Sequence, residues 1–289
     1  MGDCMKQLFT GLAFSILWAS ASIAGKYGLR SAEPLALFTW RFFLAGLSML
    51  AIARFIRKER SPVGEEWRQL FIYGLFNTAL YLGIFIIALQ YITAGLTALA
   101  IALNPILISI MSSFIMKRKT QYHEWIGIGL GMMGVALAAY PLLAAEEISY
   151  AGMGLLILSM VTYSYGSVYY SSITWTLPRM VINGWQVLFG GFMLLPFAII
   201  FYQGNNTLDL NLGLSLFWLV VPVSILSVQL WLRLLKADAV KASLWLFLCP
   251  VFGISFSTWL LDEAFTWYTG VGAVLVLGAL WIGQQAKRN

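Results

Sequence analysis

The chain has 289 residues, of which 60% are hydrophobic and only 10% are charged, and its mean hydropathy is +0.81. A typical soluble domain carries about 25% charged residues, so this composition excludes an ordinary soluble protein and indicates an all-α integral membrane protein. The net charge of +6 would suggest nucleic-acid binding in a soluble chain. Here the cations lie in short connectors between apolar runs, where they set membrane orientation, and we expect no nucleic-acid partner.

Ten apolar runs follow one another along the chain. Each is long enough, at about 1.5 Å per residue, to cross the roughly 30 Å hydrocarbon core of a bilayer. The first run contains Ala19-Ser20-Ala21, which mimics a signal-peptidase site, but it continues past that site, and we expect it to be retained. The ten predicted spans are Leu8–Ala24, Pro34–Phe55, Leu70–Leu89, Ala94–Met116, Trp125–Leu143, Gly152–Tyr170, Val181–Tyr202, Gly213–Leu235, Ala242–Leu261 and Trp267–Gly283.

Prolines and glycines recur in the sequence at an interval of about half its length. Pro105 in the fourth span matches Pro250 in the ninth (250 − 105 = 145), and Gly127 matches Gly272 (272 − 127 = 145). Five spans per copy is an odd number, so the second copy must cross the membrane in the opposite sense. We therefore predict two inverted five-helix repeats, residues 1–145 and 146–289, in one membrane domain. Inverted repeats are typical of secondary transporters.

The distribution of Lys and Arg predicts the orientation. Fifteen of the 18 fall on the side that holds both termini, whereas the other side carries only Lys26 and Arg30. The positive-inside rule then places both termini in the cytoplasm. We expect a multi-pass protein of the plasma membrane, which in bacteria is the inner membrane.

Enzymatic chemistry finds no support in the sequence. His123 is the only histidine, no span interior holds a carboxylate, and Cys4 and Cys249 lie far apart in the chain. We expect no enzyme activity, metal or cofactor. The stretch from Gly129 to Gly134 fits a GxGxxG pattern, but it lies inside a hydrophobic run with no preceding strand, so we interpret it, with Gly127, as a helix-packing surface.

Polar and aromatic residues near the middle of the spans are the candidate substrate ligands, because such groups are costly to expose to lipid. The alternative for each is a hydrogen bond between helices. The repeated mid-span prolines of the fourth and ninth spans predict bends, since each leaves a carbonyl unpaired. The candidates are Trp18, Arg41, Asn77, Tyr81, Asn104, Tyr163, Ser167, Gln229 and Trp245, with helix kinks at Pro105 and Pro250.

Arg41 bears on the charge of the substrate. It lies seven residues after Pro34, roughly 10 Å into its helix. One interpretation is that its guanidinium bonds carbonyls of neighbouring helices. The other is that it faces a cavity, where a cation without an intramembrane carboxylate favours a substrate with an anionic group. A cage of aromatic rings that holds a quaternary amine is the rival hypothesis.

Several of these features together resemble the drug/metabolite transporter superfamily in its ten-helix, EamA-like branch, over nearly the whole chain. They are the paired proline spans, Arg41, the Ala-rich entries Ala94–Ala98 and Ala239–Ser243, and the acidic ending Leu261-Asp262-Glu263. Where the family often has a matching glutamate in the first half, this chain has Lys117-Arg118-Lys119, which argues against a symmetric acidic pair. The resemblance implies a basket-like helical transporter, often an exporter of amino acids or other small metabolites.

We therefore predict export of a small metabolite through a central cavity between the repeats, with an amino acid or related carboxylate favoured. Transport of quaternary amines or other drugs is the alternative, and a non-transporting membrane scaffold is the third. The predicted partners are a small-molecule substrate and the lipid bilayer. We expect a monomer, with an oligomer left open.

Overall fold

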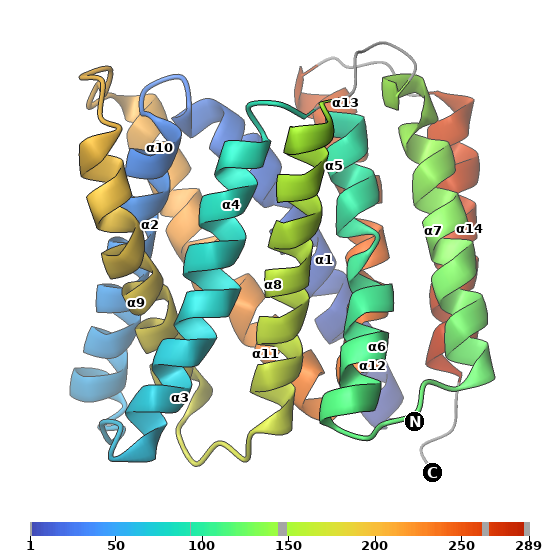
Figure 1. The fold of residues 1–289 in the computed structure, drawn as a ribbon, viewed down its shortest axis with the longest axis horizontal. Coiled ribbons are helices and arrows are strands. Elements are labelled where there is room, and N and C mark those ends of the chain that lie inside the picture. Colours follow the sequence, from blue (N-terminus) through green and yellow to red (C-terminus); the bar gives the residue numbers. More distant parts are fainter. Residues whose placement is uncertain (1, 93, 144–148, 262–265, 286–289) are drawn as a thin grey trace.

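The computed structural model describes residues 2–92, 94–143, 149–261 and 266–285, and the regular structure within these ranges is entirely helical. The helices stand side by side in a bundle (Figure 1). They are α1 (Gly2–Gly28), α2 (Pro34–Ala51), η1 (Ile52–Ile56), α3 (Glu65–Gly74), η2 (Leu75–Leu80), α4 (Tyr81–Ala88), α5 (Ala94–Ile101), α6 (Asn104–Ile115), α7 (Tyr122–Leu143), α8 (Tyr150–Ser172), α9 (Arg179–Ile200), α10 (Leu210–Trp218), η3 (Leu219–Ser227), α11 (Val228–Ala237), α12 (Ala239–Leu244), η4 (Trp245–Phe247), α13 (Leu248–Leu261) and α14 (Trp267–Gln284).

Within the described ranges, nine continuous helical stretches are long and apolar enough to cross a bilayer. They coincide with nine of the ten predicted spans, so the all-helical prediction is confirmed. The remaining predicted span, Trp125–Leu143, falls on α7, a 22-residue helix that lies beside α14 (Figure 1). The count of ten spans stays a prediction.

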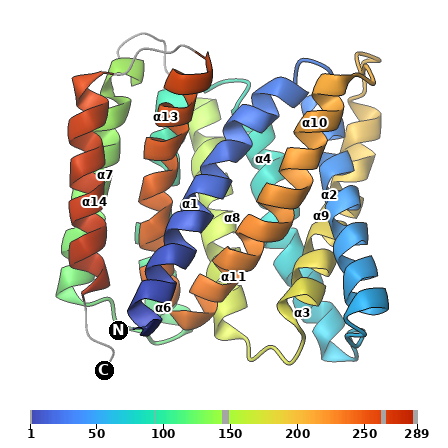
Figure 2. The ribbon, with the colours of Figure 1, turned by 180° about the vertical axis from the view of Figure 1, so that it is seen from behind.

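The two halves of the chain pack across each other. Figure 2 shows α1 running between α13 on one side and α10 and α11 on the other, so the first helix is embedded in the second half. Conversely, α8 packs against α4 and α6 of the first half. The chain direction of α8 is opposite to that of α1 (Figure 1). Each half therefore contributes its first helix to the other.

Glycines bring two further pairs of helices into close contact, α2 with α9 and α7 with α14. A Cβ on Gly46 would lie 3.0 Å from the carbonyl oxygen of Gly184, and one on Gly127 would lie 2.8 Å from that of Ala279. Such approaches leave no room for a side chain. The structure thus supports the helix-packing interpretation of the Gly127 to Gly134 stretch.

The fourth and ninth spans are both interrupted next to a proline, Pro105 and Pro250. In the fourth span, α5 ends at Ile101 and α6 begins at Asn104, which places Pro105 in its first turn. In the ninth span, the 3₁₀ segment η4 joins α12 to α13, and Pro250 is the third residue of α13. A proline lacks the N–H that would continue the helical ladder, so a break before it is the expected backbone response.

The connectors rich in Lys and Arg gather at one end of the bundle, which we call the cationic end. Connectors 57–64 and 116–121 lie there, together with the start of α1 and the end of α14 (Figure 1). Connector 173–178 lies at the same end; it has no Lys or Arg of its own and leads into Arg179. Connectors 29–33 and 201–209 lie at the opposite end. The separation of charge predicted from the sequence is therefore also a separation in space.

Candidate functional site

Arg41 lies inside the bundle, with 5% of its surface exposed. Its Nε donates a hydrogen bond of 2.8 Å to Ser224 Oγ, and the guanidinium carbon lies 5.5 Å from the ring centres of both Phe38 and Phe42. No carboxylate among the described residues pairs with it. A buried cation with only a hydroxyl and two rings around it retains hydrogen-bonding capacity for an anionic group.

A chain of buried polar side chains leads from Ser224 to Asn77. The Nδ2 of Asn183 donates to the Ser224 carbonyl oxygen at 2.8 Å, and the Nε2 of Gln186 donates to Asn183 Oδ1 at 3.0 Å. The Oε1 of Gln186 then accepts from Asn77 Nδ2 at 3.2 Å and from Thr78 Oγ1 at 2.6 Å. We call Arg41, Ser224, Asn183, Gln186, Thr78 and Asn77 the polar network.

The polar network rests on two π-helical segments at matching positions of the two halves. Asn77 and Thr78 belong to η2, which begins at Leu75, and Ser224 belongs to η3, which begins at Leu219 (219 − 75 = 144). In η3 the widened turn also contains Pro222. π-helical turns inside α-helices occur frequently at functional sites, which makes this region the first place to look for a ligand.

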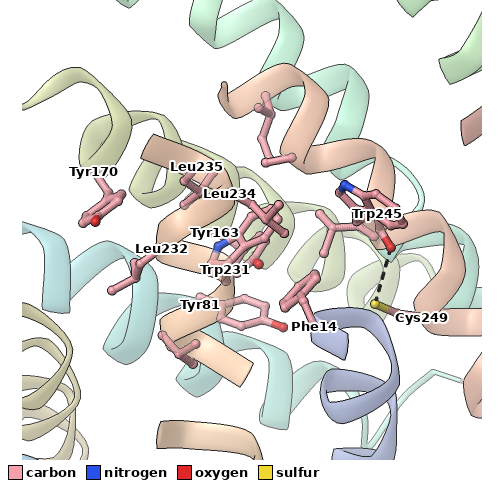
Figure 3. Close-up of a cluster of buried hydrophobic side chains, with 14 of the residues drawn as sticks. Phe14, Tyr81, Tyr163, Tyr170, Trp231, Leu232, Leu234, Leu235, Trp245 and Cys249 are labelled. Carbon is pink, nitrogen blue, oxygen red and sulfur yellow. Dashed lines mark hydrogen bonds between the residues drawn. The ribbon is translucent and has the colours of Figure 1, made fainter. Parts of the chain in front are cut away.

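Aromatic rings form a second cluster next to the polar network. Trp231 stacks on Phe14 with ring centres 4.8 Å apart and lies 6.1 Å from Tyr163, and Tyr81 lies 4.7 Å from Tyr163 (Figure 3). Trp18 closes the group at 6.4 Å from Tyr163. We call these five residues the aromatic cluster. Its members come from α1, α4, α8 and α11, that is, from both halves of the chain.

Two polar atoms of the aromatic cluster have no hydrogen-bond partner in the described part of the chain. They are the hydroxyl of Tyr163 and the Nε1 of Trp231, and both are buried. Buried polar groups are nearly always satisfied, so each orphaned atom needs an explanation. Ordered water or a bound ligand would supply it.

Ser167 and Asn104, by contrast, use their polar groups within the protein. The Oγ of Ser167 donates to the carbonyl oxygen of Tyr163 at 2.9 Å. Asn104 donates to the Ile101 carbonyl oxygen at 3.0 Å and accepts from Ser164 Oγ at 2.9 Å. These two side chains therefore form hydrogen bonds within the protein, which is the alternative to a role in substrate binding.

Trp245 and Gln229 lie outside the aromatic cluster. Trp245 is buried, its carbonyl oxygen accepts from Ser15 Oγ at 2.9 Å, and its ring occupies the space where Gly11 lacks a side chain. Figure 3 places it beside Cys249, on the far side of Phe14 from Tyr81. Gln229 donates to the carbonyl oxygen of Arg179 at 3.2 Å, near the cationic end.

The proline spans contact the first helices of the opposite halves in a matching way. Asn104 of α6 bonds Ser164 of α8, whereas Trp245, just before α13, accepts from Ser15 of α1. The breaks near Pro105 and Pro250 therefore lie where each proline span meets the other half.

An ion cluster closes the cationic end. Arg118 makes two bonds of 2.5 and 2.6 Å to the fully buried Glu124, and its Nη2 donates to Asp238 Oδ2 at 2.8 Å. Asp238 is also the N-cap of α12 and accepts from the Lys241 backbone N–H. Burial opposes the charge of Arg118, but the hydrogen bonds that it donates to Glu124 and Asp238 raise its pKa above the ordinary value. The cluster ties the α6–α7 connector to the start of the ninth span.

Smaller contacts join connectors of the two halves at both ends. At the cationic end, Glu66 accepts from Arg60 and from Thr176. At the opposite end, Ser31 Oγ donates to Asp209 Oδ2 at 2.8 Å, and the Glu33 backbone N–H donates to Asn206 Oδ1 at 2.7 Å. Helix α13 ends at Leu261, and the other two residues of the acidic ending, Asp262 and Glu263, fall outside the described ranges.

Sequence reasoning missed Thr78, Asn183, Gln186, Ser224 and Trp231. Asn183 and Gln186 are spaced i, i+3 in an otherwise apolar helix, the same signal that singled out Asn77 with Tyr81. They lie in the first turns of their span, so a criterion of mid-span depth overlooked them. No periodicity in the sequence marks Trp231, because its role depends on stacking against another half of the chain.

Comparison with known proteins decides the family. The family model described as the EamA-like transporter family matches the chain twice, at residues 5–140 and 150–282. The chain belongs to the EamA-like transporter family. A solved crystal structure superposes with a TM-score of 0.82 over 97% of both chains at 18% identity, which shows a shared fold.

Relatives of this EamA-like protein are named as transporters. An uncharacterized transporter of Synechocystis is 24% identical, with 96% of this chain and 90% of the relative aligned. A probable amino-acid metabolite efflux pump of Salmonella typhimurium is also 24% identical, with 96% of this chain and 94% of the relative aligned. The family resemblance inferred from the sequence is confirmed, and transport is the family's function.

Proposed function

We propose that this EamA-like protein exports a small metabolite, an amino acid or related carboxylate, through a site between its two halves. The observation that carries the proposal is Arg41, a buried cation that no carboxylate of the described chain neutralises. A carboxylate substrate would complete that site by a charge-assisted hydrogen bond. The name of the Salmonella relative, an efflux pump for amino-acid metabolites, supports both the substrate class and the direction.

Two inverted five-helix repeats, residues 1–145 and 146–289, are part of the proposal, with α7 as the tenth span. The exchange of α1 and α8 between the halves and their opposite directions support it. The cationic end then faces the cytoplasm, with both termini there. Reporter fusions after Arg60 and after Gln203 test this topology, because they must report opposite compartments. The same compartment for both would refute it.

We place the substrate between the polar network and the aromatic cluster. Arg41, Asn77, Tyr81, Tyr163 and Trp18 are the proposed ligands carried over from the sequence, and Trp231 joins them. The side chains of Asn104, Ser167 and Gln229 form hydrogen bonds within the protein, and the ring of Trp245 packs against Gly11. We therefore assign all four to the scaffold around the site. The breaks at Pro105 and Pro250 supply points where the proline spans can change their packing.

The loose packing of one end supports alternating access. In the ninth span, the described side chains from Phe252 to Leu260 are all at least partly exposed, whereas all of α12 and η4 except Lys241 is buried. A transporter must open one end while the other stays closed. The difference along one span is the asymmetry expected of a molecule closed at its cationic end.

Uptake into liposomes by the purified protein tests the function. We expect counterflow of one or more amino acids from a panel that also contains amines and sugar phosphates. Arg41→Lys should lower, and Arg41→Gln should nearly abolish, transport of carboxylate substrates, while both variants keep wild-type thermal stability. Normal carboxylate transport by Arg41→Gln would refute the role of this residue.

A second candidate function is transport of quaternary amines. The aromatic cluster favours it, because rings attract cations through their faces. The same assay separates the two, since a quaternary-amine carrier would transport choline-like cations and ignore carboxylates.

A further inference from the structure

The amide groups of the polar network have only one consistent orientation. The chain of hydrogen bonds starts at the Ser224 carbonyl oxygen, which can only accept. Asn183 must therefore present its Nδ2 to that oxygen, and its Oδ1 accepts from Gln186 Nε2. Each amide fixes the next one, because a flipped group would face oxygen with oxygen or N–H with N–H.

Asn77 is the last amide in this chain of hydrogen bonds. Gln186 has used its Nε2, so it presents Oε1, which accepts from Asn77 Nδ2 and Thr78 Oγ1. Asn77 Oδ1 is then left as an acceptor, and this atom is buried with no partner among the described residues. The residue itself is 9% exposed. A buried acceptor of this kind requires a donor from outside the described protein.

The position of this acceptor connects it with the proposed site. Asn77 lies one helical turn before Tyr81, whose ring packs on Tyr163 in the aromatic cluster. Arg41 belongs to the same polar network through its hydrogen bond to Ser224. A cation, a lone acceptor and aromatic rings therefore occupy one region of the bundle.

We propose that Asn77 Oδ1 accepts a hydrogen bond from the primary ammonium group of the substrate while Arg41 binds its carboxylate. The site then selects zwitterions with free N–H groups. The rings of Tyr81 and Tyr163 favour the ammonium by cation–π attraction, but a quaternary ammonium has no hydrogen to donate and would leave Asn77 Oδ1 unpaired. This inference rests on the proposed function and narrows its substrate class.

The test compares four molecules that carry the same phenyl group. We use phenylalanine, because its ring suits an aromatic surrounding, together with its N,N,N-trimethyl derivative, phenylpropionate and phenethylamine. Uptake of radiolabelled phenylalanine into proteoliposomes is measured with each as competitor. Thermal shift of the purified protein gives a second readout, since a bound ligand raises the melting temperature. We expect phenylalanine to bind about tenfold or more tightly than its trimethyl derivative.

Asn77→Leu is the decisive variant, because it removes the acceptor without leaving a new orphan: Gln186 Oε1 keeps its bond from Thr78. We expect it to fold, to lose the preference for phenylalanine over the trimethyl derivative, and to bind phenylpropionate as the wild type does. The matched control is Ser112→Ala, which also removes a buried, unpartnered oxygen but outside the site, and it should leave the selectivity unchanged.

Two kinds of result would overturn the inference, and they differ from failure of the proposed function. If Asn77→Leu keeps the wild-type preference, Asn77 Oδ1 binds structural water and no substrate. If the wild type binds the trimethyl derivative as well as phenylalanine, the aromatic cluster alone recognises the cation. If none of the four molecules is bound or transported by the wild type, the proposed function itself is wrong.

Discussion

The two ends of the ninth span differ in packing although both are rich in apolar residues. Toward the cationic end, η4 is wholly buried and Trp245 fills the space beside Gly11. Beyond Pro250, a Cβ on Gly253 would meet no atom within 4 Å, and the side chains up to Leu260 are at least partly exposed. The fourth span repeats the pattern, since Asn104 and Pro105 are buried while α5 has one buried side chain, Ala100, among those described.

One apolar span can therefore have a tightly packed part that is held in place and a loosely packed part that is freer to move. The tightly packed part is tied to the ion cluster and to the first helices of both halves. The described side chains from Phe252 to Leu260 are less buried against protein, so displacing them breaks fewer packing contacts with neighbouring helices. The prolines mark the boundary, because the missing hydrogen bond already weakens the ladder there.

The largest effect should come from breaking the ion cluster. Arg118→Gln leaves Glu124 buried without its cation, and we expect a loss of about 3 kcal/mol in the free energy of unfolding. Arg60→Gln is the matched control, since the arginine of the Arg60–Glu66 pair is exposed to solvent, and losing this pair should destabilise the protein much less. Denaturation in detergent micelles measures both. Equal losses would mean that the cationic end is not specially stabilised by this cluster.

The next largest effect should come from adding a methyl group at the tightly packed end, whereas the same addition at the loosely packed end should be tolerated. Gly11→Ala places a Cβ inside the Trp245 ring, which we expect to destabilise the protein by about 1–3 kcal/mol. Gly253→Ala lies in open space and should be neutral or stabilise by up to about 1 kcal/mol, since alanine favours helix. The melting temperatures of the two variants should therefore move in different directions. A similar drop in both would contradict the difference in packing.

Chemical accessibility tests the same contrast with substitutions that hardly change side-chain volume. Ser243→Cys and Ser255→Cys lie on the same span, and both serines bond a carbonyl of their own helix. With Cys4 and Cys249 replaced by serine, we expect a charged maleimide to label position 255 several-fold faster than position 243, which is fully buried. Labelling of position 243 should appear only after denaturation. Equal rates in the folded protein would refute a closed cationic end.

The smallest effect concerns pH at the opposite end. Hydrogen bonds from the Leu212 backbone N–H and from Ser31 hold the pKa of Asp209 below its ordinary value of 3.8. A lowered carboxyl pKa stabilises the folded state above pH 3.8 and loses that contribution as the pH falls through the folded-state pKa. As the pH falls from 5 to below the folded-state pKa of Asp209, the melting temperature of the wild type should therefore fall slightly more than that of Asp209→Asn. Identical pH profiles for the wild type and Asp209→Asn would show that the Asp209 carboxylate does not stabilise this loop contact.

The sequence by itself determined the helical membrane fold, the positions of nine spans, the family and the separation of cationic connectors. These properties follow from local composition, because a run of apolar residues has few alternatives in a bilayer. Arg41 and Asn77 were also recognisable, since a polar group inside an apolar run is conspicuous without knowledge of its neighbours.

Only the tertiary structure decided which polar groups meet. Asn183 and Gln186 join Asn77 to Ser224 across three helices, and Trp231 stacks on Phe14 from the other half of the chain. Such contacts depend on how whole helices cross, which no local pattern records. The difference between the two ends of the proline spans arises in the same way: hydropathy along a span says how apolar it is, whereas burial depends on which neighbours the fold brings against it.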